Sequence, residues 1–225
     1  MLSIIVPCLN EAEGIAGTLA ALAPLRARGA EVIVVDGGSQ DGTIERATPC
    51  ADLVIRAERG CGAQMNTGAA RARGEILLFM HADTLLPEGA DTLIVDGLKR
   101  SRRGWGRFDV SIAGSHPLLR VVELQMNLRS RLTGVATGHQ AIFVTRSLFT
   151  AAGGYPEIAL MEDLALCGQL KHYGPPLCLS HRITTSARRW EKNGVLSTAW
   201  LSWRLRLAYR LGADPGKLAM QYDRH

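Results

Sequence analysis

Hydrophobic residues gather into short unbroken runs in the first 85 residues of this chain. The runs at 2–7, 31–36, 53–56 and 76–80 are bounded by Pro, Gly or charged residues. A short continuous apolar run is typical of a strand buried on both faces, as in a parallel sheet. Helical patterns separate the runs, and this alternation predicts parallel strands joined by right-handed crossovers.

The segments between these strands have helical spacing. We expect a helix from Asn10 to about Pro24, a short helix starting at Thr43, an Ala-rich helix over 62–73 and a helix over 87–100. Asn10 with Glu13 three residues later fits a capping box at the start of the first helix. The first part of the chain is therefore predicted to be a layered α/β unit.

The pattern changes after Gly104. Residues 105–112 alternate apolar and polar, which predicts a strand with one solvated face. Further elements are expected at 117–132 (helix), 140–144 (strand), 162–172 (helix), 177–182 (strand) and 195–211 (helix). No linker or repeat separates these parts. We predict one domain over 1–225, divided into 1–103, 104–190 and a basic C-terminal helix in 191–225.

Charge is unevenly distributed along the chain. Residues 182–225 hold nine Lys and Arg against three acidic residues, whereas 1–181 carry a net charge of −1. Such a basic segment suits an anionic lipid, a phosphorylated substrate or nucleic acid. The aromatic content is only 5% and no nucleic-acid motif occurs, so we expect no nucleic-acid partner.

Cysteine usage and hydropathy bear on the compartment. The five cysteines are odd in number and show no CxxC spacing, which favours a reducing compartment over a disulfide framework or a zinc site. No run of about 18 apolar residues occurs, so no transmembrane helix is predicted. The N-terminus fits a strand better than a signal peptide. We expect a cytoplasmic protein.

The predicted helix 195–211 has more apolar surface than one core-facing stripe needs. One side carries a stripe of five residues: Leu196, Trp200, Trp203, Leu207 and Leu211. Leu201 and Leu205 lie on the opposite side. The favoured interpretation is core packing with a contact to another lobe or to a second subunit in a homodimer. The alternative is peripheral attachment to the cytoplasmic face of a membrane.

Candidate ligand-binding residues follow the central strand 76–80. Ligands of open α/β sheets bind beyond the carboxyl ends of the strands, where His81, Ala82 and Asp83 lie. A carboxylate with an imidazole two residues earlier can hold a divalent cation against phosphate oxygens. The alternative is that Asp83 stabilises a turn or caps the following helix.

Two other segments of the first part have ligand-binding chemistry. Asp36 ends a strand and can accept a hydrogen bond from a base or a ribose, or serve a βα turn. Arg59, Gln64 and Asn66 flank a Gly-rich helix start and can bind phosphate or sugar, or act as caps. Neither GxGxxG nor GxxxxGK[ST] occurs, so a dinucleotide site and a P-loop are not supported.

Later in the chain, Glu162 and Asp163 open a helix. Each is a cap or a general base. Arg188, Arg189 and Trp190 form either a diphosphate clamp or a solvated charge pair beside an aromatic ring. His139 and His181 stand alone and are expected to be packed or surface residues, not ligands.

Four segments in a fixed order carry a family resemblance: SIIVPCLNEAEGI at 3–15, VIVVDGGSQDGT at 32–43, GAARARGEILLFMHADT at 68–84 and MEDLAL at 161–166. The chain resembles the family 2 glycosyltransferases. The resemblance implies the GT-A fold, a Rossmann-like, mostly parallel α/β sheet with helices on both faces and a C-terminal acceptor-side lobe. RGCGAQMN, FMHADT, TGHQAIF and ARRW are similar to a compact bacterial soluble branch.

The resemblance implies inverting transfer of a sugar from a nucleoside diphosphate to a hydroxyl acceptor, a lipid or a glycan. Residues 1–103 would bind the donor and 104–190 the acceptor. Asp163, beside Glu162, would be the general base, and Asp83 would bind Mg²⁺ or Mn²⁺ on the diphosphate. The implied donor contacts are Pro7, Asn10, Glu11, Asp36, Arg59, Gln64, Asn66, His81, Ala82, Arg188, Arg189 and Trp190.

Two departures from the family pattern qualify these expectations. His81 stands where the DxD motif has its first Asp, and imidazole suits Mg²⁺ less well than carboxylate does. Ser186 stands where processive members carry Gln before Arg-Trp, which disfavours a polymer synthase. The alternatives are a sugar-nucleotide pyrophosphorylase, which the sequence Cys8-Leu9-Asn10-Glu11 disfavours, and an idle nucleotide-sugar-binding protein.

Overall fold

The computed structural model describes residues 1–223, so Arg224 and the end of the predicted 191–225 segment lie outside the described residues. The described strands form one eight-stranded sheet in the order β3-β2-β1-β4-β7-β6-β8-β5. Their bounds are β1 Leu2–Cys8, β2 Glu31–Asp36, β3 Leu53–Arg56, β4 Ile76–Phe79, β5 Thr84–Leu85, β6 Trp105–Ile112, β7 Ile142–Thr145 and β8 Leu177–Thr185. The sheet draws strands from both predicted halves.

Strand direction divides the sheet. The neighbours β3, β2, β1 and β4 are parallel, as predicted from their continuous apolar runs. Beyond them β7 is antiparallel to both β4 and β6, while β6 and β8 are parallel and β5 is antiparallel to β8. The predicted α/β architecture is confirmed, and its antiparallel pairs all lie in the part built after β4.

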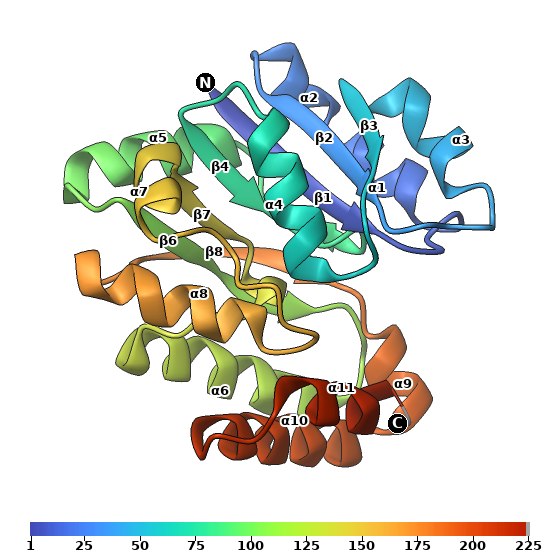
Figure 1. Ribbon diagram of the computed structural model, residues 1–225, viewed down its shortest axis with the longest axis vertical. Coiled ribbons are helices and arrows are strands. Elements are labelled where there is room, and N and C mark those ends of the chain that lie inside the picture. The colour runs from blue at the N-terminus through green and yellow to red at the C-terminus, as the bar shows by residue number, and fades with distance from the viewer. Residues whose placement is uncertain (224–225) are drawn as a thin grey trace.

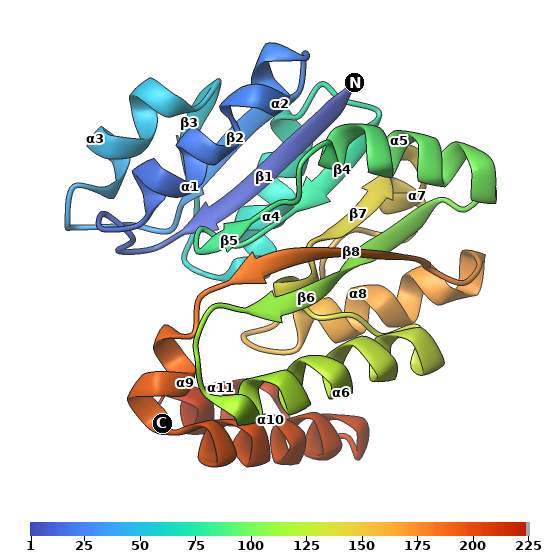
Figure 2. The same cartoon turned by 180° about the vertical axis from the view of Figure 1, so that it is seen from behind.

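Helices cover both faces of the sheet (Figure 1). Their bounds are α1 Ile15–Ala21, α2 Ala23–Ala27, α3 Thr43–Ala47, α4 Cys61–Arg71, α5 Ala90–Ser101, α6 Pro117–Thr133, α7 Arg146–Ala151, α8 Glu162–Leu170, α9 Arg188–Asn193, α10 Val195–Arg210 and α11 Pro215–Asp223. Figure 2 shows α1 and α5 on one face of the sheet, whereas α4 and α8 pack on the other. Alternate residues of β1 enter the two cores: Ile4 and Val6 face α1, and Ile5 faces α4.

Two local expectations are wrong. The first helix begins at Ile15 behind Gly14, without the predicted capping box. Asn10 instead has a left-handed backbone (φ 53°) and its Oδ1 accepts from Gln40 N. The strand 105–112 has no broadly solvated face, because Arg107 and Asp109 are buried as an ion pair that Arg131 of α6 extends.

The helix predicted over 195–211 is present as α10, and its two apolar sides differ in burial. Leu201 and Leu205 are the buried residues of this helix, whereas Leu196 is 70% exposed and Trp200 63% exposed. Trp203, Leu207 and Leu211 are exposed as well. The packed side of α10 is therefore the Leu201 and Leu205 side, which meets α11, and the five-residue apolar stripe faces outward. The elements β5, α7, α9 and α11 were not predicted.

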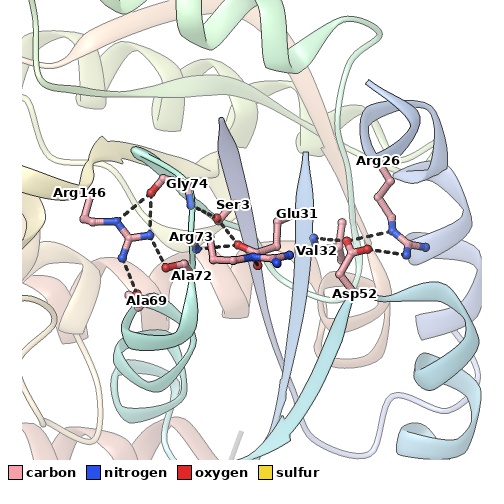
Figure 3. A network of polar contacts seen from close by, with 10 residues as sticks. All are labelled: Ser3, Arg26, Glu31, Val32, Asp52, Ala69, Ala72, Arg73, Gly74 and Arg146. Carbon is pink, nitrogen blue, oxygen red and sulfur yellow. Dashed lines mark hydrogen bonds and ion pairs between the residues drawn. The ribbon is translucent and has the colours of Figure 1, made fainter. Parts of the chain in front are cut away.

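The amino end of the parallel strands is held by a polar network (Figure 3). Glu31 is buried and accepts hydrogen bonds from Ser3 Oγ (2.6 Å), Arg73 N (2.8 Å) and Arg73 Nε (2.8 Å). The Arg146 guanidinium donates to the Gly74 carbonyl oxygen at 2.7 Å and to that of Ala72. These contacts fix the start of β4 against β1, and so fix where β4 ends.

Candidate functional site

A cavity of about 640 Å³ lies beyond the carboxyl ends of β1 and β4, where α/β sheets bind ligands. In Figure 2 the arrowheads of β1 and β8 point to the side where α9 follows β8. The structure brings nine of the predicted residues to this cavity: Pro7, Glu11, Gln64, His81, Ala82, Asp83, Arg188, Arg189 and Trp190. They come from segments more than 170 residues apart, joined by the fold.

The loops after β1 and β2 form one rim of the cavity. Glu11 N donates to Thr43 Oγ1 (2.9 Å) and Ala12 N donates to Asp41 Oδ2 (3.1 Å), so the two loops are tied together. Asp36 is buried, and its Oδ2 accepts from Gly38 N and Ser39 N. Asn10 and Asp36 therefore shape the rim, and neither lines the cavity itself.

The start of α4 presents the next wall. Gln64 lines the cavity while its Nε2 donates to the carbonyl oxygens of Cys8 (2.9 Å) and Val35 (2.7 Å). Asn66 does not line the cavity, and its side-chain amide exchanges hydrogen bonds with the backbone of Tyr155. Arg59 is exposed and does not line the cavity. Of these three, only Gln64 is placed to meet a ligand there.

The turn after β4 carries the candidate metal ligands. The Ala82 carbonyl oxygen accepts from Thr18 Oγ1 of α1 (2.6 Å), which fixes this turn. Asp83 Oδ1 has only long contacts, 3.4 Å to Thr84 Oγ1 and 3.5 Å to Thr185 Oγ1, so its carboxylate keeps acceptor capacity. Within residues 1–223 no three His, Cys, Asp or Glu side chains group as a metal site, so a cation there needs ligand oxygens as well.

Asp163 lies against the backbone of Gly138. Its Oδ2 accepts from Gly138 N at 2.6 Å, and its Oδ1 is buried without a hydrogen-bond partner among the described residues. Burial raises the pKa of Asp163, and the nearby His81 partly offsets the rise. A carboxylate with one held oxygen and one open oxygen is arranged as a proton acceptor.

Gly138 is needed for this approach. A Cβ at this position would lie 2.2 Å from His81 Nε2 and 2.9 Å from Asp163 Oδ2. Only a residue without a side chain therefore lets the turn before β7 reach both groups. Gly138 was not predicted as a site residue. The sequence marked it only by its place beside His139, in the segment TGHQAIF that carries part of the family resemblance.

His139 is half-buried and lies beside His81, with the ring centroids 5.2 Å apart. Burial, and then the charge of His81, lowers the pKa of His139 to about 4, so the imidazole is neutral near pH 7. It was expected to be packed, and it is, but it also lines the cavity. Packing and ligand contact are not exclusive for a residue on a cavity wall.

Glu162 precedes Asp163 and differs from it in environment. Burial, with the neighbouring Asp163 carboxylate, raises the pKa of Glu162 to about 8, so this carboxyl is largely protonated at pH 7. The residue before it, Met161, has a left-handed backbone (φ 74°), a strained conformation that structures retain mainly at functional sites. At neutral pH the pair therefore carries less than two full negative charges.

Segment 186–193 closes the cavity. Arg188 Nη2 donates to Glu11 Oε1 at 2.8 Å, which joins α9 to the loop after β1. Arg189 stacks on the Tyr222 ring, with its guanidinium carbon 3.4 Å from the centroid. Both arginines were predicted to act at the site, and the structure shows that they also hold the cavity wall in place.

A second cavity, of about 360 Å³, lies between α6, α8, α10 and α11. Glu162 and Asp163 line it, and it shares His81, His139 and Trp190 with the first cavity. Two adjoining cavities that meet beside a proton acceptor can place two substrates on either side of one reacting bond.

Comparison with known families and proteins gives one consistent picture. The family model Glycosyl transferase family 2 matches residues 3–146. The PGL/p-HBAD biosynthesis glycosyltransferases of Mycobacterium bovis and Mycobacterium tuberculosis are 33% identical over 167 residues, covering 69% of this chain and 63% of theirs. This chain thus aligns with less than two thirds of the length of these relatives.

Solved structures share the fold. The mannosyltransferase PcManGT from Pyrobaculum calidifontis, in complex with GDP-Man and Mn²⁺, matches 93% of this chain and 61% of its own, with a TM-score of 0.65 and 26% identity. TarS from S. aureus matches 83% of this chain and 60% of its own, with a TM-score of 0.66 and 20% identity. The predicted GT-A fold is confirmed.

Proposed function

Because this chain belongs to glycosyltransferase family 2, we propose that it transfers a sugar from a nucleoside diphosphate to a hydroxyl acceptor, with inversion at the anomeric carbon. The observation that carries the proposal is the junction of the two cavities beside Asp163. The donor occupies the cavity at the ends of β1 and β4, and the acceptor occupies the cavity between α6 and α10.

The donor side has the chemistry that a diphosphate requires. Asp83 and His81 would hold a divalent cation, which would neutralise charge on the diphosphate leaving group. Arg188 and Arg189 add cationic groups at the same wall. PcManGT, at 26% identity, was solved with GDP-Man and Mn²⁺, which supports a nucleotide-sugar donor and a metal.

Asp163 acts as the general base. The acceptor oxygen forms a bond to the anomeric carbon while the bond to the diphosphate breaks, and the hydroxyl proton moves to Asp163 Oδ1, the open oxygen. The raised pKa of Asp163 brings it closer to the pH at which it must take up that proton. Gly138 N holds Oδ2 and so fixes the carboxylate orientation.

Thermal shift and hydrolysis assays test this proposal together. We expect one class among UDP-, GDP- and TDP-sugars to raise the unfolding midpoint, and only when Mn²⁺ is present. Asp83→Ala should remove the metal-dependent part of this shift. Binding of a nucleotide sugar without slow hydrolysis or transfer would point to a binding protein, and no binding at all would reject the donor proposal.

We further propose that α6 and α10 rest on an anionic membrane surface. The two helices contact each other and lie side by side in Figures 1 and 2. Both expose large apolar residues: Val121, Leu124, Leu128 and Leu132 on α6, and Leu196, Trp200, Trp203 and Leu207 on α10, followed by Leu211 at its C-cap. No helix within residues 1–223 has the length and hydropathy needed to cross a bilayer, so such contact would be interfacial.

The charge of α6 and α10 favours an anionic membrane over a second copy of this chain as the partner of their exposed apolar residues. Four of the six arginines on the two helices are exposed, namely Arg120, Arg131, Arg204 and Arg210, and Glu123 is the only acidic residue in their sequences. Glu123 is buried and pairs with Arg120, so neither helix exposes a carboxylate. Arginines around an exposed apolar face fit anionic lipid headgroups, whereas a second copy of the same surface would meet it with like charge.

Liposome co-sedimentation tests the membrane proposal. We expect binding to vesicles with anionic lipid, weakened by salt, and lost in the double variant Trp200→Ser/Trp203→Ser. Tyr173→Ser removes an exposed aromatic ring outside these helices and is the matched control. A dimer in solution that dissociates in the double variant, with no vesicle binding, would assign the face to a homodimer instead.

A further inference from the structure

The cavity between α6 and α10 has walls of two kinds. Most of its lining is apolar, with Ile112, Val122, Met126, Leu160, Leu164 and Leu205 among the contributors. The polar catalytic groups lie where it meets the donor cavity, at Asp163 and His81. A ligand that fills it must therefore have an apolar body next to the hydroxyl that reacts.

One cation interrupts the apolar walls. Among the described residues, Arg206 of α10 is the only Lys or Arg that lines this cavity. It has no hydrogen bond or ion pair with any described residue. Burial, and then the nearby Arg210, lowers its pKa. Arg206 is half-buried, so its guanidinium has lost part of its contact with water without gaining a carboxylate. This arrangement is unusual, because charges that are withdrawn from water in proteins are normally paired.

A second unpaired guanidinium lies near that of Arg206. Arg129 of α6 has all three side-chain nitrogens buried and without a partner among residues 1–223. Its pKa falls to about 10, because of burial and then the charges of Arg206 and Arg210. Three arginines on two contacting helices thus repel one another, and the acids of α8, Glu162 and Asp163, form no ion pair with them.

We infer that the acceptor is an amphiphilic anion: its hydroxyl meets Asp163, its apolar body fills the cavity, and its carboxylate or phosphate group binds Arg206. This inference rests on the proposed transferase function and names the acceptor class for it. An anionic group there satisfies the open guanidinium donors and relieves the repulsion among Arg206, Arg129 and Arg210. A neutral acceptor would leave these charges as they are.

The transfer balances with such an acceptor. The hydroxyl oxygen bonds to the anomeric carbon, the bond from that carbon to the diphosphate oxygen breaks with its electron pair on the diphosphate, and the hydroxyl proton goes to Asp163. The anionic group takes no part in bond making. It acts in binding and register, so its loss should raise KM more than it lowers kcat.

Matched probes test the inference. ω-Hydroxy carboxylic acids, ω-hydroxyalkyl phosphates and α,ω-diols of equal length, from about six to about twelve carbons to suit a small ligand cavity, differ only in the terminal group. Transfer from the donor is followed by mass spectrometry, and probe binding by calorimetry. We expect the better of the two anionic series to exceed the diols in kcat/KM by about tenfold or more, the usual scale for a hydrogen-bonded charge.

Variants assign the effect to one residue. Arg206→Met should bring the preference for the anion to within about twofold through KM, and Arg206→Lys should restore part of it. Arg204→Met removes an exposed arginine of the same helix that bonds Gln221, and should keep the full preference. Retention of the preference in Arg206→Met would overturn the assignment to Arg206.

The outcomes separate the two proposals. A wild-type enzyme that neither binds nor hydrolyses any nucleotide sugar contradicts the transferase function itself. An enzyme that hydrolyses its donor, but binds and glycosylates the anionic probes no better than the diols, contradicts only the acceptor class. The carboxylate and phosphate series distinguish a fatty-acid-like acceptor from a phosphorylated one.

Discussion

The two ends of the parallel strands treat their buried polar groups differently. At the amino end, Glu31 accepts three hydrogen bonds and Arg146 donates to three backbone carbonyls, those of Ala69, Ala72 and Gly74 (Figure 3). At the carboxyl end, polar atoms of Asp163, Arg189 and Thr198 are buried without partners among the described residues. The same sheet is thus satisfied at one end and left open at the other.

This difference separates stability from function. Buried polar groups in folded proteins are nearly always hydrogen-bonded, and unpaired ones call for an explanation. The proposed substrates would supply the missing partners at the carboxyl end, and the cost of leaving these groups open is carried by the rest of the fold. Substitutions at the amino end should therefore change stability, and those at the carboxyl end should change turnover.

The sharpest test is Asp163→Asn. We expect kcat to fall by about 10² to 10⁴, the usual contribution of a general base, with donor affinity kept. The unfolding free energy should not fall, because a buried carboxylate is replaced by a neutral amide. Asp96→Asn on the exposed side of α5 is the control. Parallel loss of stability and turnover would make Asp163 a structural cap.

The reverse pattern is expected at Glu31. Glu31→Ala leaves Ser3 Oγ and Arg73 N without their acceptor, which should lower the unfolding free energy by about 2–4 kcal/mol. The kcat of the remaining folded enzyme should stay near the wild-type value. Urea titration and assays on the same samples measure both, with the exposed Glu13→Gln as control. A large fall in kcat would couple the two ends.

Gly138→Ala should lower both the unfolding free energy and kcat. The added methyl group meets His81 Nε2 and Asp163 Oδ2, so the turn must shift, at a cost of about 1–3 kcal/mol in stability. A displaced base should lower kcat by about tenfold to a hundredfold. Gly168→Ala in α8 meets nothing within 4 Å and should leave kcat unchanged. Full activity in Gly138→Ala would show that this turn adapts.

The smallest effect is a difference in pH dependence. The folded pKa of Glu162 is about 8, above its ordinary value, so its contribution to stability is lost as pH rises from about 4.5 to about 8. For Glu31 burial alone raises the pKa, but hydrogen bonds from Ser3 and Arg73 outweigh it and the net pKa is lowered. Its contribution is lost as pH falls through that lowered value.

Unfolding measured between about pH 3 and about pH 9 should show both windows. Glu162→Gln should flatten the neutral window and leave the acidic one, and Glu31→Gln should do the opposite. If neither substitution changes the profile, these two carboxyls do not set the pH dependence of stability.

The parallel strands could be predicted from sequence because their signal is local. Runs such as 31–36 and 53–56 have the same bounds in the structure. The strand 105–112 was placed correctly, but one of its faces was wrongly predicted to be solvated. The alternation of apolar and polar residues does not show that Arg107 and Asp109 pair with each other in the protein interior. Two residues apart in sequence, they form a buried pair only when α6 covers them.

The site was predictable where a residue ends a strand and unpredictable where it depends on packing. Asp83 and His81 follow β4 directly, so their place at the cavity follows from the fold class. Gly138 matters only because the turn before β7 meets Asp163, a contact across 25 residues. The outward face of α10 depends on α11, whose presence no local pattern indicated.

The ion pair between Glu11 and Arg188 has a consequence for biogenesis. It joins residues 177 positions apart, so the wall of the donor cavity is completed by two distant parts of the chain. Closing so long a loop costs more conformational entropy, so this contact is expected to form late in folding. The strands β1, β2 and β4 pair over shorter separations. A nascent chain on the ribosome is therefore expected to assemble its parallel strands well before it completes this cavity.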